Sequence, residues 1–364
     1  MDEEDRQEEA SATFLAAKER SLKTEEKIAK SPSSFKMITG DRPTGRLHLG
    51  HFFGSLKTRV ELQNKGLKCA VVIADYQVIT DRDTTAHIED NVLEMVIDYM
   101  ACGIDPEKTM IFTHSYAPSL NQLMLPFMSL VSEAELARNP TVHAEMLASN
   151  HSLTALLLTY PVHQSCDILF YSADGMPTVV PVGKDNLPHI QIARTIAKRF
   201  NSRFASDEPV FSAPVALLSD APEIPGLDGR KMSKSYKNSI MLCATAEETK
   251  DLIKKSPSDS ERRITFDPAG RPQISALLTT AALTTGRSER EIAEDIGEGG
   301  AGALKSYVAE SVNEFLAPIR EKRRELEKGR EGIREILRAG NEKAEKIAAA
   351  TLEKVREAME MVYY

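Results

Sequence analysis

Apolar and polar residues follow two different periods along the first two thirds of the chain. Three short apolar runs have the length and composition of buried strands: residues 35–39, 68–75 and 109–113. Between and after them, apolar residues recur at helical spacing over residues 49–64, 86–101 and 119–135. Strands that alternate with helices predict βαβ units, and therefore an α/β fold with a Rossmann-like, doubly wound parallel sheet.

After about residue 240 the strand pattern fades, and charged amphipathic helices follow, including residues 312–327 and 341–362. The last of these carries one apolar stripe at spacings of four and three: Ala348, Leu352, Val355, Met359 and Val362. The pattern predicts a C-terminal α-helical domain, whose final helix packs on the body of the protein or on a partner subunit.

Residues 1–34 mix acidic residues, lysine and alanine, and they end in the breaker cluster Ser-Pro-Ser-Ser. They predict an acidic N-terminal extension that is partly helical and carries no catalytic residue. With the shift of pattern near residue 240, three regions are expected: the extension at 1–34, a catalytic domain at 35–240 and a helical domain at 241–364.

Composition excludes several classes of protein. Hydrophobic residues make up 41% and charged residues 27%, as in globular proteins, and no apolar run approaches the ~20 residues of a membrane span. The acidic N-terminus lacks the features of a targeting peptide, so we expect a cytoplasmic protein. Four scattered cysteines without a C-x-x-C pair predict reduced thiols and no structural metal. The net charge of −8 argues against a broad nucleic-acid-binding surface but leaves local contacts with RNA open, and no DNA partner is expected.

The first segment with chemical content is G-D-R-P-T-G-R-L-H-L-G-H, at residues 40–51, between the first strand and the first helix. A turn in this place brings a ligand to the carboxyl edge of a parallel sheet. It also points free backbone N–H groups and the positive end of a helix dipole at phosphate. ATP is the expected occupant.

Two alternatives for this segment differ in what they require. Gly40 and Gly45 have the spacing of a P-loop, but Arg46 and Leu47 follow where that motif needs Lys and Ser or Thr. His48 and His51 are three residues apart, so both rings lie on one helix face and can donate to the same phosphate oxygens. A metal-binding pair would need further ligands nearby, and none is present. This segment alone leaves a chance pair of histidines as open as a functional one.

A second segment, G-L-D-G-R-K-M-S-K-S at residues 226–235, predicts a hydrophilic loop with glycine hinges. Lys231 and Lys234 on such a loop can close over a triphosphate and stabilise the charge that develops on pyrophosphate. Either segment alone is weak, and the two together favour a nucleotide-activating enzyme.

The two segments resemble the H-I-G-H and K-M-S-K-S motifs of the class I aminoacyl-tRNA synthetases. About 180 residues separate them, too few for the large editing insertion of the bigger class I enzymes, which leaves the tyrosyl and tryptophanyl subgroup. Residues 158–169 (L-T-Y-P-V-H-Q-S-C-D-I-L) and 180–185 (V-P-V-G-K-D) resemble the tryptophanyl pattern. Tyrosyl enzymes usually carry G-G-x-D-Q instead.

This resemblance runs from about residue 36 to the C-terminal helix and implies roles by position. The implied catalytic residues are His48, His51, Lys231 and Lys234. The implied ATP site comprises Arg42, Pro43, Thr44, Gly50, His51, Gly183, Lys184, Asp185, Ile224, Lys231, Met232, Ser233, Lys234 and Ser235. The implied tryptophan site comprises Ile38, Gln77, Asp167 and Asn186.

Asp167 falls where the family has the carboxylate that accepts the indole N–H. An indole has one donor and no acceptor, and a carboxylate matches it because it only accepts. Several positions depart from the family pattern and indicate a divergent branch: Arg42, Gln77, His143, Glu145 and Asn186.

The resemblance also implies a homodimer that uses ATP with Mg²⁺, L-tryptophan and tRNA(Trp). The helical domain is expected to meet the tRNA, and five basic residues are candidates for backbone contacts or for a solvated helix face: Arg320, Lys322, Arg323, Arg324 and Arg330. Two alternatives remain: a paralogue that makes the adenylate without charging tRNA, and a noncatalytic RNA-binding protein. The intact motif residues speak against the second.

Overall fold

A five-stranded parallel sheet forms the centre of the molecule. The computed structural model describes residues 3–80, 84–143, 154–183, 186–218 and 224–364, and of residues 3–12 the backbone only. The strands lie in the order β3-β2-β1-β4-β5. Their bounds are β1 Lys36–Asp41, β2 Lys68–Ile73, β3 Thr109–Thr113, β4 Thr178–Val182 and β5 Val215–Leu218.

The sheet confirms the predicted α/β class. The structure places β3 at the predicted residues, and β1 and β2 within two residues of them, whereas the sequence pattern did not single out β4 and β5. From β1 the chain proceeds outward to β2 and β3, and then returns to the other side of β1 for β4 and β5. The direction of winding therefore reverses between β1 and β4, and a doubly wound sheet opens a ligand crevice at that point.

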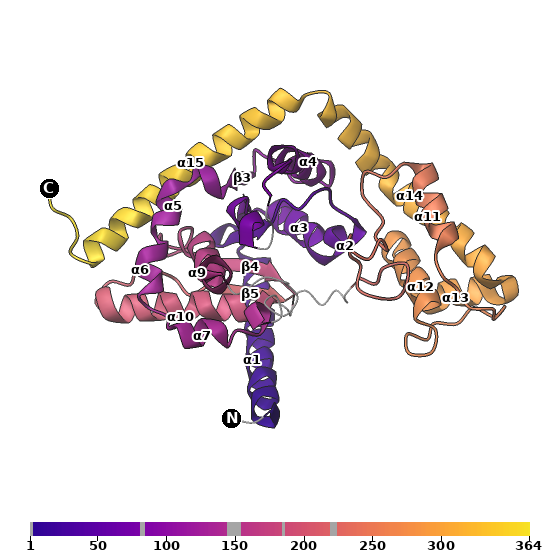
Figure 1. Cartoon of the computed structure of the whole chain (residues 1–364), viewed down its shortest axis with the longest axis horizontal. Helices are drawn as coiled ribbons and strands as arrows, with labels where there is room; N and C mark the ends of the chain where they lie inside the picture. Colours follow the sequence, from indigo (N-terminus) through magenta and orange to yellow (C-terminus); the bar gives the residue numbers. More distant parts are fainter. Residues whose placement is uncertain (1–2, 81–83, 144–153, 184–185, 219–223) are drawn as a thin grey trace.

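Helices cover both faces of the sheet (Figure 1). The predicted first helix divides into α2 (Leu49–His51), the π-helical turn η2 (Phe52–Leu56) and α3 (Lys57–Lys65), and the second is α4 (Ile88–Ala101). Two further helices, α9 (Ala155–Leu169) and α10 (Leu187–Phe204), pack against each other.

The single helix predicted over residues 119–135 is wrong, because three short helices occupy this segment. They are α5 (Pro118–Gln122), α6 (Met124–Met128) and α7 (Glu133–Ala137). Pro126 has no N–H to donate to the carbonyl of Gln122, so one continuous helix would lose a hydrogen bond there. Ser132 then starts a new helix, because its hydroxyl accepts from the Glu135 N–H while the Glu135 carboxylate accepts from the Ser132 N–H.

A helical region follows the sheet, on the right of Figure 1. It comprises α11 (Ala246–Lys255), α12 (Pro272–Thr285), α13 (Glu289–Ile296), the turn η6 (Gly297–Gly299) and α14 (Gly300–Glu327). The long α14 packs on α11 and α12 and also on α4 of the body. Its buried residues join one hydrophobic cluster with residues of α4 and β2, so the core is continuous between the two regions.

The last helix, α15 (Arg330–Ala358), runs back over the body toward the C-terminus on the left of Figure 1. Three members of the predicted apolar stripe, Ala348, Leu352 and Val355, are buried in a cluster that includes residues of the sheet, whereas Val362 is exposed. Gly340 lies so close to β3 that an added Cβ would stand 1.8 Å from the carbonyl oxygen of Ile111. Of the two predicted packing surfaces, the helix uses the body.

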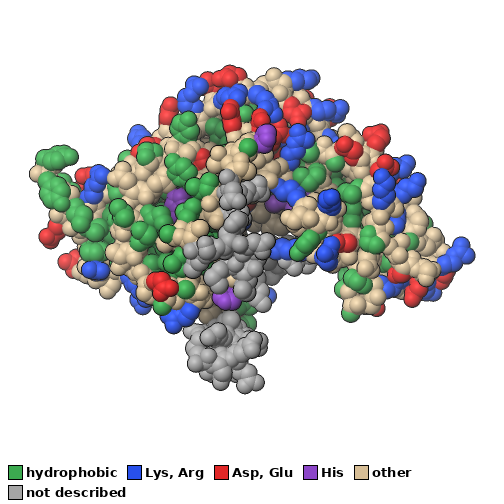
Figure 2. Space-filling view, in the orientation of Figure 1, with side chains coloured by type: hydrophobic (Ala, Val, Ile, Leu, Met, Phe, Trp, Pro, Cys, Tyr) green, Lys and Arg blue, Asp and Glu red, His purple; other side chains and the backbone are tan. Residues whose placement is uncertain are grey.

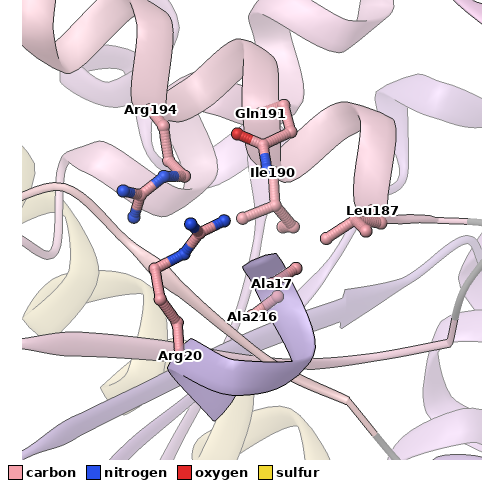
Figure 3. A pocket seen from close by; sticks show the side chains of 7 residues that line it. All are labelled: Ala17, Arg20, Leu187, Ile190, Gln191, Arg194 and Ala216. Atoms are coloured by element: carbon pink, nitrogen blue, oxygen red, sulfur yellow. The ribbon is translucent and has the colours of Figure 1, made fainter. Parts of the chain in front are cut away.

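The N-terminal extension is one long helix, α1 (Glu3–Lys30), followed by the short turn η1 (Pro32–Ser34). Its C-terminal half packs along the edge strand β5 through a buried stripe: Ala17, Ser21, Thr24 and Ile28. The N–H of Leu218 in β5 donates to Ser21 Oγ at 3.0 Å, which gives a partner to an edge group. In Figure 3, Arg20 of α1 and Arg194 of α10 reach toward the same recess at this junction.

Two further features bear on the expectations from composition. In the part of the chain that the structure describes, no helix is both long and apolar enough to cross a membrane. All four cysteines are free, and Cys69 and Cys166 are buried. Burial raises the pKa of the Cys69 thiol to about 12, so this thiol is protonated at neutral pH.

Candidate functional site

The segments that follow β1 and β4 meet at the point where the direction of winding reverses. The predicted nucleotide turn begins at the end of β1, and Gly183 follows β4 directly. The N–H of Asn186 donates to the carbonyl of Gly183 at 3.2 Å and leads into α10. Two predicted ATP-site residues, Lys184 and Asp185, lie outside the described residues, as does Glu145. The carboxyl edge of the sheet thus collects segments that are far apart in sequence.

His48 and His51 lie against each other at the start of α2. Their ring centroids are 3.8 Å apart, and the backbone N–H of His48 donates to His51 Nδ1 at 3.1 Å. Because Nδ1 of His51 accepts, the proton of a neutral ring sits on Nε2, where it can be donated to a ligand. The predicted placement of both rings on one face is therefore found.

Gly50, between the two histidines, has no room for a side chain. An added Cβ would stand 2.9 Å from two atoms of the His48 ring and 3.4 Å from Met232 Sδ. The N–H of Gly50 points at that sulfur, at 3.3 Å. A glycine here lets the second motif approach the first, which a larger residue would prevent.

Both histidines are neutral at physiological pH. Burial, together with the nearby His51 and Lys234, lowers the pKa of His48 to about 3. Burial also lowers the pKa of His51 to about 4, although the carboxylate of Asp41 opposes it. Each ring therefore offers one N–H rather than two, and the pair can act as uncharged donors to a ligand.

The loop at residues 226–235 is held against the first motif by an ordered turn. Pro225 and Lys231 form an antiparallel bridge, and the Met232 N–H donates to the carbonyl of Ile224 at 3.1 Å. Asn238 closes the loop, because its Oδ1 accepts from the Ser233 N–H at 2.8 Å and its Nδ2 donates to Asp228 at 2.7 Å. Ile224 and Met232 are buried, whereas Lys231 and Ser235 are exposed.

Lys234 joins the two motifs directly. Its ammonium group donates to the carbonyl oxygens of Thr44 at 3.1 Å and of Arg46 at 3.2 Å. Backbone bonds beside it strengthen the junction: Leu49 N–H to the Ile240 carbonyl at 2.9 Å, and Leu242 N–H to the Leu47 carbonyl at 3.0 Å. Two segments 190 residues apart in sequence thus form one surface.

Behind His51 lies a buried group of charges that the sequence analysis missed. Asp41, the last residue of β1, binds Arg59 through both carboxylate oxygens, at 2.5 and 3.1 Å, and accepts from the Tyr99 hydroxyl at 2.5 Å. Burial would raise the pKa of Asp41, but Arg59 and Tyr99 outweigh it and hold the value near 2. The position of Asp41 at a strand end was the available signal, whereas nothing local marks Arg59 or Tyr99.

Asp167, the predicted tryptophan ligand, is buried in α9 beside His114. His114 begins the 3₁₀ turn η4 (His114–Tyr116) after β3, and its Nε2 lies 2.7 Å from Asp167 Oδ1. The ring N–H does not point along this line, so the contact is an ion contact rather than an aligned hydrogen bond. The sequence analysis did not identify His114.

Gln77 lies in the same group, in η3 (Tyr76–Thr80). Its Nε2 is 2.6 Å from His163 Nδ1, and His163 Nε2 is 2.7 Å from Asn121 Oδ1. Burial, more than the neighbouring charges, lowers the pKa of His163, so that ring is neutral. A neutral ring accepts from Gln77 and donates to Asn121, which uses both nitrogens.

The other predicted residues take varied positions. Ile38 is buried in β1, in a hydrophobic cluster that also contains Cys166 and Ile168. Arg42 donates to Thr80 Oγ1 at 3.4 Å, which ties the nucleotide turn to η3. Pro43 is buried and Thr44 is half-buried beside Lys234. The assignment of Ile38 and Asn186 to a tryptophan pocket stays a prediction.

The structure corrects one expectation about the helical domain. Arg323, a candidate for contact with RNA, is 2% exposed and binds Glu94 and Asp98 of α4. Arg330 also binds Glu94, and it lies 3.1 Å from Asp90. The prediction for Arg323 is therefore wrong, because the helical domain docks on α4 through this residue. Lys322 and Arg324 are exposed.

Known proteins resemble the chain over most of its length. It is 38% identical to a tryptophan-tRNA ligase of Clostridium longisporum, over 90% of this chain and 97% of that protein. It is 36% identical to the enzyme of that name from Thermotoga maritima, over 90% and 100%. A solved tryptophanyl-tRNA synthetase of Campylobacter jejuni, complexed with ADP and tryptophan, is 29% identical with a TM-score of 0.77, over 89% of this chain and 99% of that chain. The family model for class I tRNA synthetases (W and Y) matches residues 30–317, and the chain belongs to this family.

Proposed function

We propose that the chain activates L-tryptophan with ATP and transfers it to tRNA(Trp). The observation that carries this proposal is the contact between the two motifs, with the Lys234 ammonium group on the turn that holds His48 and His51. The tryptophan-tRNA ligases that resemble the chain over 90% of its length support the choice of amino acid.

In the first step an oxygen of the tryptophan carboxylate forms a bond to the α-phosphorus of ATP. The bond from that phosphorus to the bridging oxygen breaks, and pyrophosphate leaves with the negative charge. Lys231 and Lys234 stabilise this charge, and the neutral His48 and His51 donate their N–H groups to phosphate oxygens. In the second step a terminal hydroxyl of the tRNA takes the tryptophanyl group, and AMP leaves.

Lys234 must exchange partners in this reaction. Two backbone carbonyls hold its ammonium group beside the nucleotide turn. These neutral acceptors stabilise a cation less than a phosphate does, so a bound triphosphate takes over the contact. The rest of the proposed ATP site surrounds this point: Arg42, Pro43, Thr44, Gly50, Gly183, Lys184, Asp185, Ile224, Met232, Ser233 and Ser235.

Asp167 supplies the proposed choice of amino acid. Its carboxylate is 5% exposed, and a buried carboxylate is costly unless donors meet it. The indole N–H is such a donor, and phenylalanine has none. Gln77, Asn186 and Ile38 complete the proposed tryptophan site.

Three further partners belong to the proposal. Mg²⁺ enters with ATP and is held by its phosphates, because Arg59 and Tyr99 already occupy the nearby carboxylate of Asp41. Exposed apolar side chains, including Tyr76 and Tyr116, support a homodimer. These two residues lie on neighbouring segments, because the N–H of Ser115 donates to Asp75. The enzyme works in the cytoplasm, where tRNA is charged.

The decisive experiment is tryptophan-dependent exchange of pyrophosphate into ATP, followed by charging of tRNA. Both activities are expected, and phenylalanine should support neither at similar concentration. Exchange without charging would indicate a paralogue that makes the adenylate for another acceptor. The absence of both, in a folded protein, would contradict the proposal.

A further inference from the structure

Among the described residues, the carboxylate of Asp167 has one charged partner at contact distance. His114 is fully buried, and its Nε2 lies 2.7 Å from Asp167 Oδ1. Among the residues that the structure describes, none donates to Oδ2 of the same carboxylate. A buried carboxylate with one oxygen engaged by a histidine and the other without a donor is incomplete until a further donor arrives.

A cation is the first alternative, because His114, His163 and Asp167 bring ligand atoms within 4.8 Å of one another. The hydrogen bonds of His163 favour another arrangement. Gln77 and Asn121 already occupy both of its ring nitrogens, at 2.6 and 2.7 Å. A metal ion would have to displace one of these partners, whereas a network of hydrogen bonds needs no rearrangement.

The backbone that carries His114 is held from two sides. The N–H of Thr113, the preceding residue, donates to Asn341 Oδ1 of α15 at 2.9 Å. The carbonyl of His114 accepts from Asn121 Nδ2 at 2.9 Å, and Asn121 is also the partner of His163. The backbone of His114 therefore cannot move away from Asp167 without breaking contacts to α15 and α5.

We propose that His114 is a positioning residue of the amino-acid pocket, which engages Oδ1 of Asp167 as an imidazolium so that Oδ2 accepts the indole N–H of the substrate. This inference deepens the proposed function and rests on it. His114 itself does not touch tryptophan in this arrangement. It favours a substrate with an N–H, because the imidazolium balances the negative charge of the carboxylate and leaves Oδ2 open as an acceptor.

The charges around His114 support this state. The titratable groups that face it are Asp167 and His163 of α9, Asp75 between β2 and η3, and Tyr76 of η3. Glu345 of α15 is engaged by Ser119. Burial lowers the pKa of His114, but the carboxylates of Asp167 and Asp75 outweigh it, and the net direction is upward. The imidazolium is thus present below this raised pKa and is lost as the pH rises through it.

The test compares His114→Asn with His87→Asn in the full-length protein. His87 is an exposed histidine whose backbone lies in the left-handed region that Asn tolerates, so the control removes an imidazole without strain. The assay is pyrophosphate exchange with tryptophan and with β-(benzothiophen-3-yl)alanine, in which sulfur replaces the indole N–H. H114N should raise the KM for tryptophan roughly tenfold or more, since Asp167 loses its partner. The KM for the sulfur analogue should change little, so the preference for tryptophan over this analogue becomes smaller. The KM for ATP should stay the same.

The pH profile separates positioning from packing. In the wild type and in H87N, the KM for tryptophan should rise as the pH passes upward through the pKa of His114. In H114N this rise of the KM with pH should disappear. A substitution that only loosened the core would not remove a titration from the KM.

Four results would each contradict the role of His114 or the proposed function on which it rests. H114N with the wild-type preference for tryptophan over the sulfur analogue would show that His114 does not act through Asp167. Stoichiometric zinc in the purified wild type, lost in H114N, would show a metal site instead. Should H114N fail to fold, H114Q replaces it, and additive effects of H114Q and D167N in the double variant would also overturn the inference. If the wild type shows no tryptophan-dependent exchange at all, the proposed function itself fails.

Discussion

Two clusters of buried charge differ in how many of their carboxylate oxygens have donors. Where α14 docks on α4, all four carboxylate oxygens of Glu94 and Asp98 have donors: Arg323, Arg330, Arg46 and the Leu47 N–H. In the proposed amino-acid pocket, Asp167 has one close polar contact among the described residues, to His114. Figure 2 shows acidic and basic side chains interspersed over the region of α4, α14 and α15.

The difference indicates what each cluster is for. Buried carboxylates that find every partner within the chain hold two parts of the fold in register, and adding a ligand would gain nothing. A buried carboxylate that lacks a donor costs stability in the free protein, and a substrate that supplies the donor recovers this cost. We therefore assign the first cluster to docking of the helical domain and the second to selection of the substrate.

The largest effect is expected from a substitution that disrupts the second cluster. Asp167→Ala should remove most of the preference for tryptophan over phenylalanine, because a site built to accept a substrate N–H can reject an analogue without it by roughly 10⁴–10⁵. The measurement is kcat/KM for both amino acids in pyrophosphate exchange, with Asp251→Ala on the surface of α11 as the control. A D167A enzyme that keeps its preference but loses ATP binding or folding would show that Asp167 is structural.

Breaking the first cluster should affect stability instead. Arg323→Met leaves Glu94 and Asp98 buried without their main partner, which costs about 3–5 kcal/mol of unfolding free energy. Urea unfolding measures this loss, and Arg324→Met, on the exposed face of the same helix, should change stability by less than ~0.5 kcal/mol. Equal stability of the two variants would contradict the structural assignment.

The ammonium group of Lys234 is intermediate between the two clusters, because backbone carbonyls bind it until the phosphates of ATP replace them. Lys234→Ala should lower the rate of tryptophan activation by roughly 10²–10³, as for the loss of one preorganised donor, while tryptophan affinity changes little. Single-turnover formation of the adenylate measures the rate. Lys237→Asn, two residues after the same loop and at a positive φ of 54° that Asn tolerates, is the matched control. Normal activation with weak tryptophan binding would mean that the loop serves the other substrate.

The smallest effect on activity is expected outside both clusters. Removing residues 1–30 should leave exchange and charging nearly unchanged, since α1 carries none of the motif residues. It should still lower the unfolding free energy, by about 1–3 kcal/mol for the lost burial of Ile28 alone. Thermal unfolding beside the two activity assays separates these outcomes. A selective loss of charging would show that the helix helps to hold tRNA.

Local pattern in the sequence was sufficient for several parts of this protein. Strand β3 is a short run of consecutive apolar residues, and helix α4 has apolar residues at a period of 3.6; both patterns depend only on near neighbours. The H-L-G-H and K-M-S-K-S segments could be identified because each motif is contiguous. Asp167 could be proposed because the residues around it resemble a family pattern.

Tertiary structure alone decided which distant residues meet. Arg323 looked like its basic neighbours on α14, and only the docking of that helix on α4 buried it. His114 carried no local signal, because its partner Asp167 is 53 residues away and reaches it through the packing of α9 beside the end of β3. The 3.6-residue period marks the apolar face of a helix but not the surface that covers it. Only the structure therefore showed that the stripe on α15 packs on the body and that α1 is buried against β5. Side chains that are brought together by the packing of distant elements need no regular spacing in sequence, and for that reason the charge clusters form only when the chain is folded.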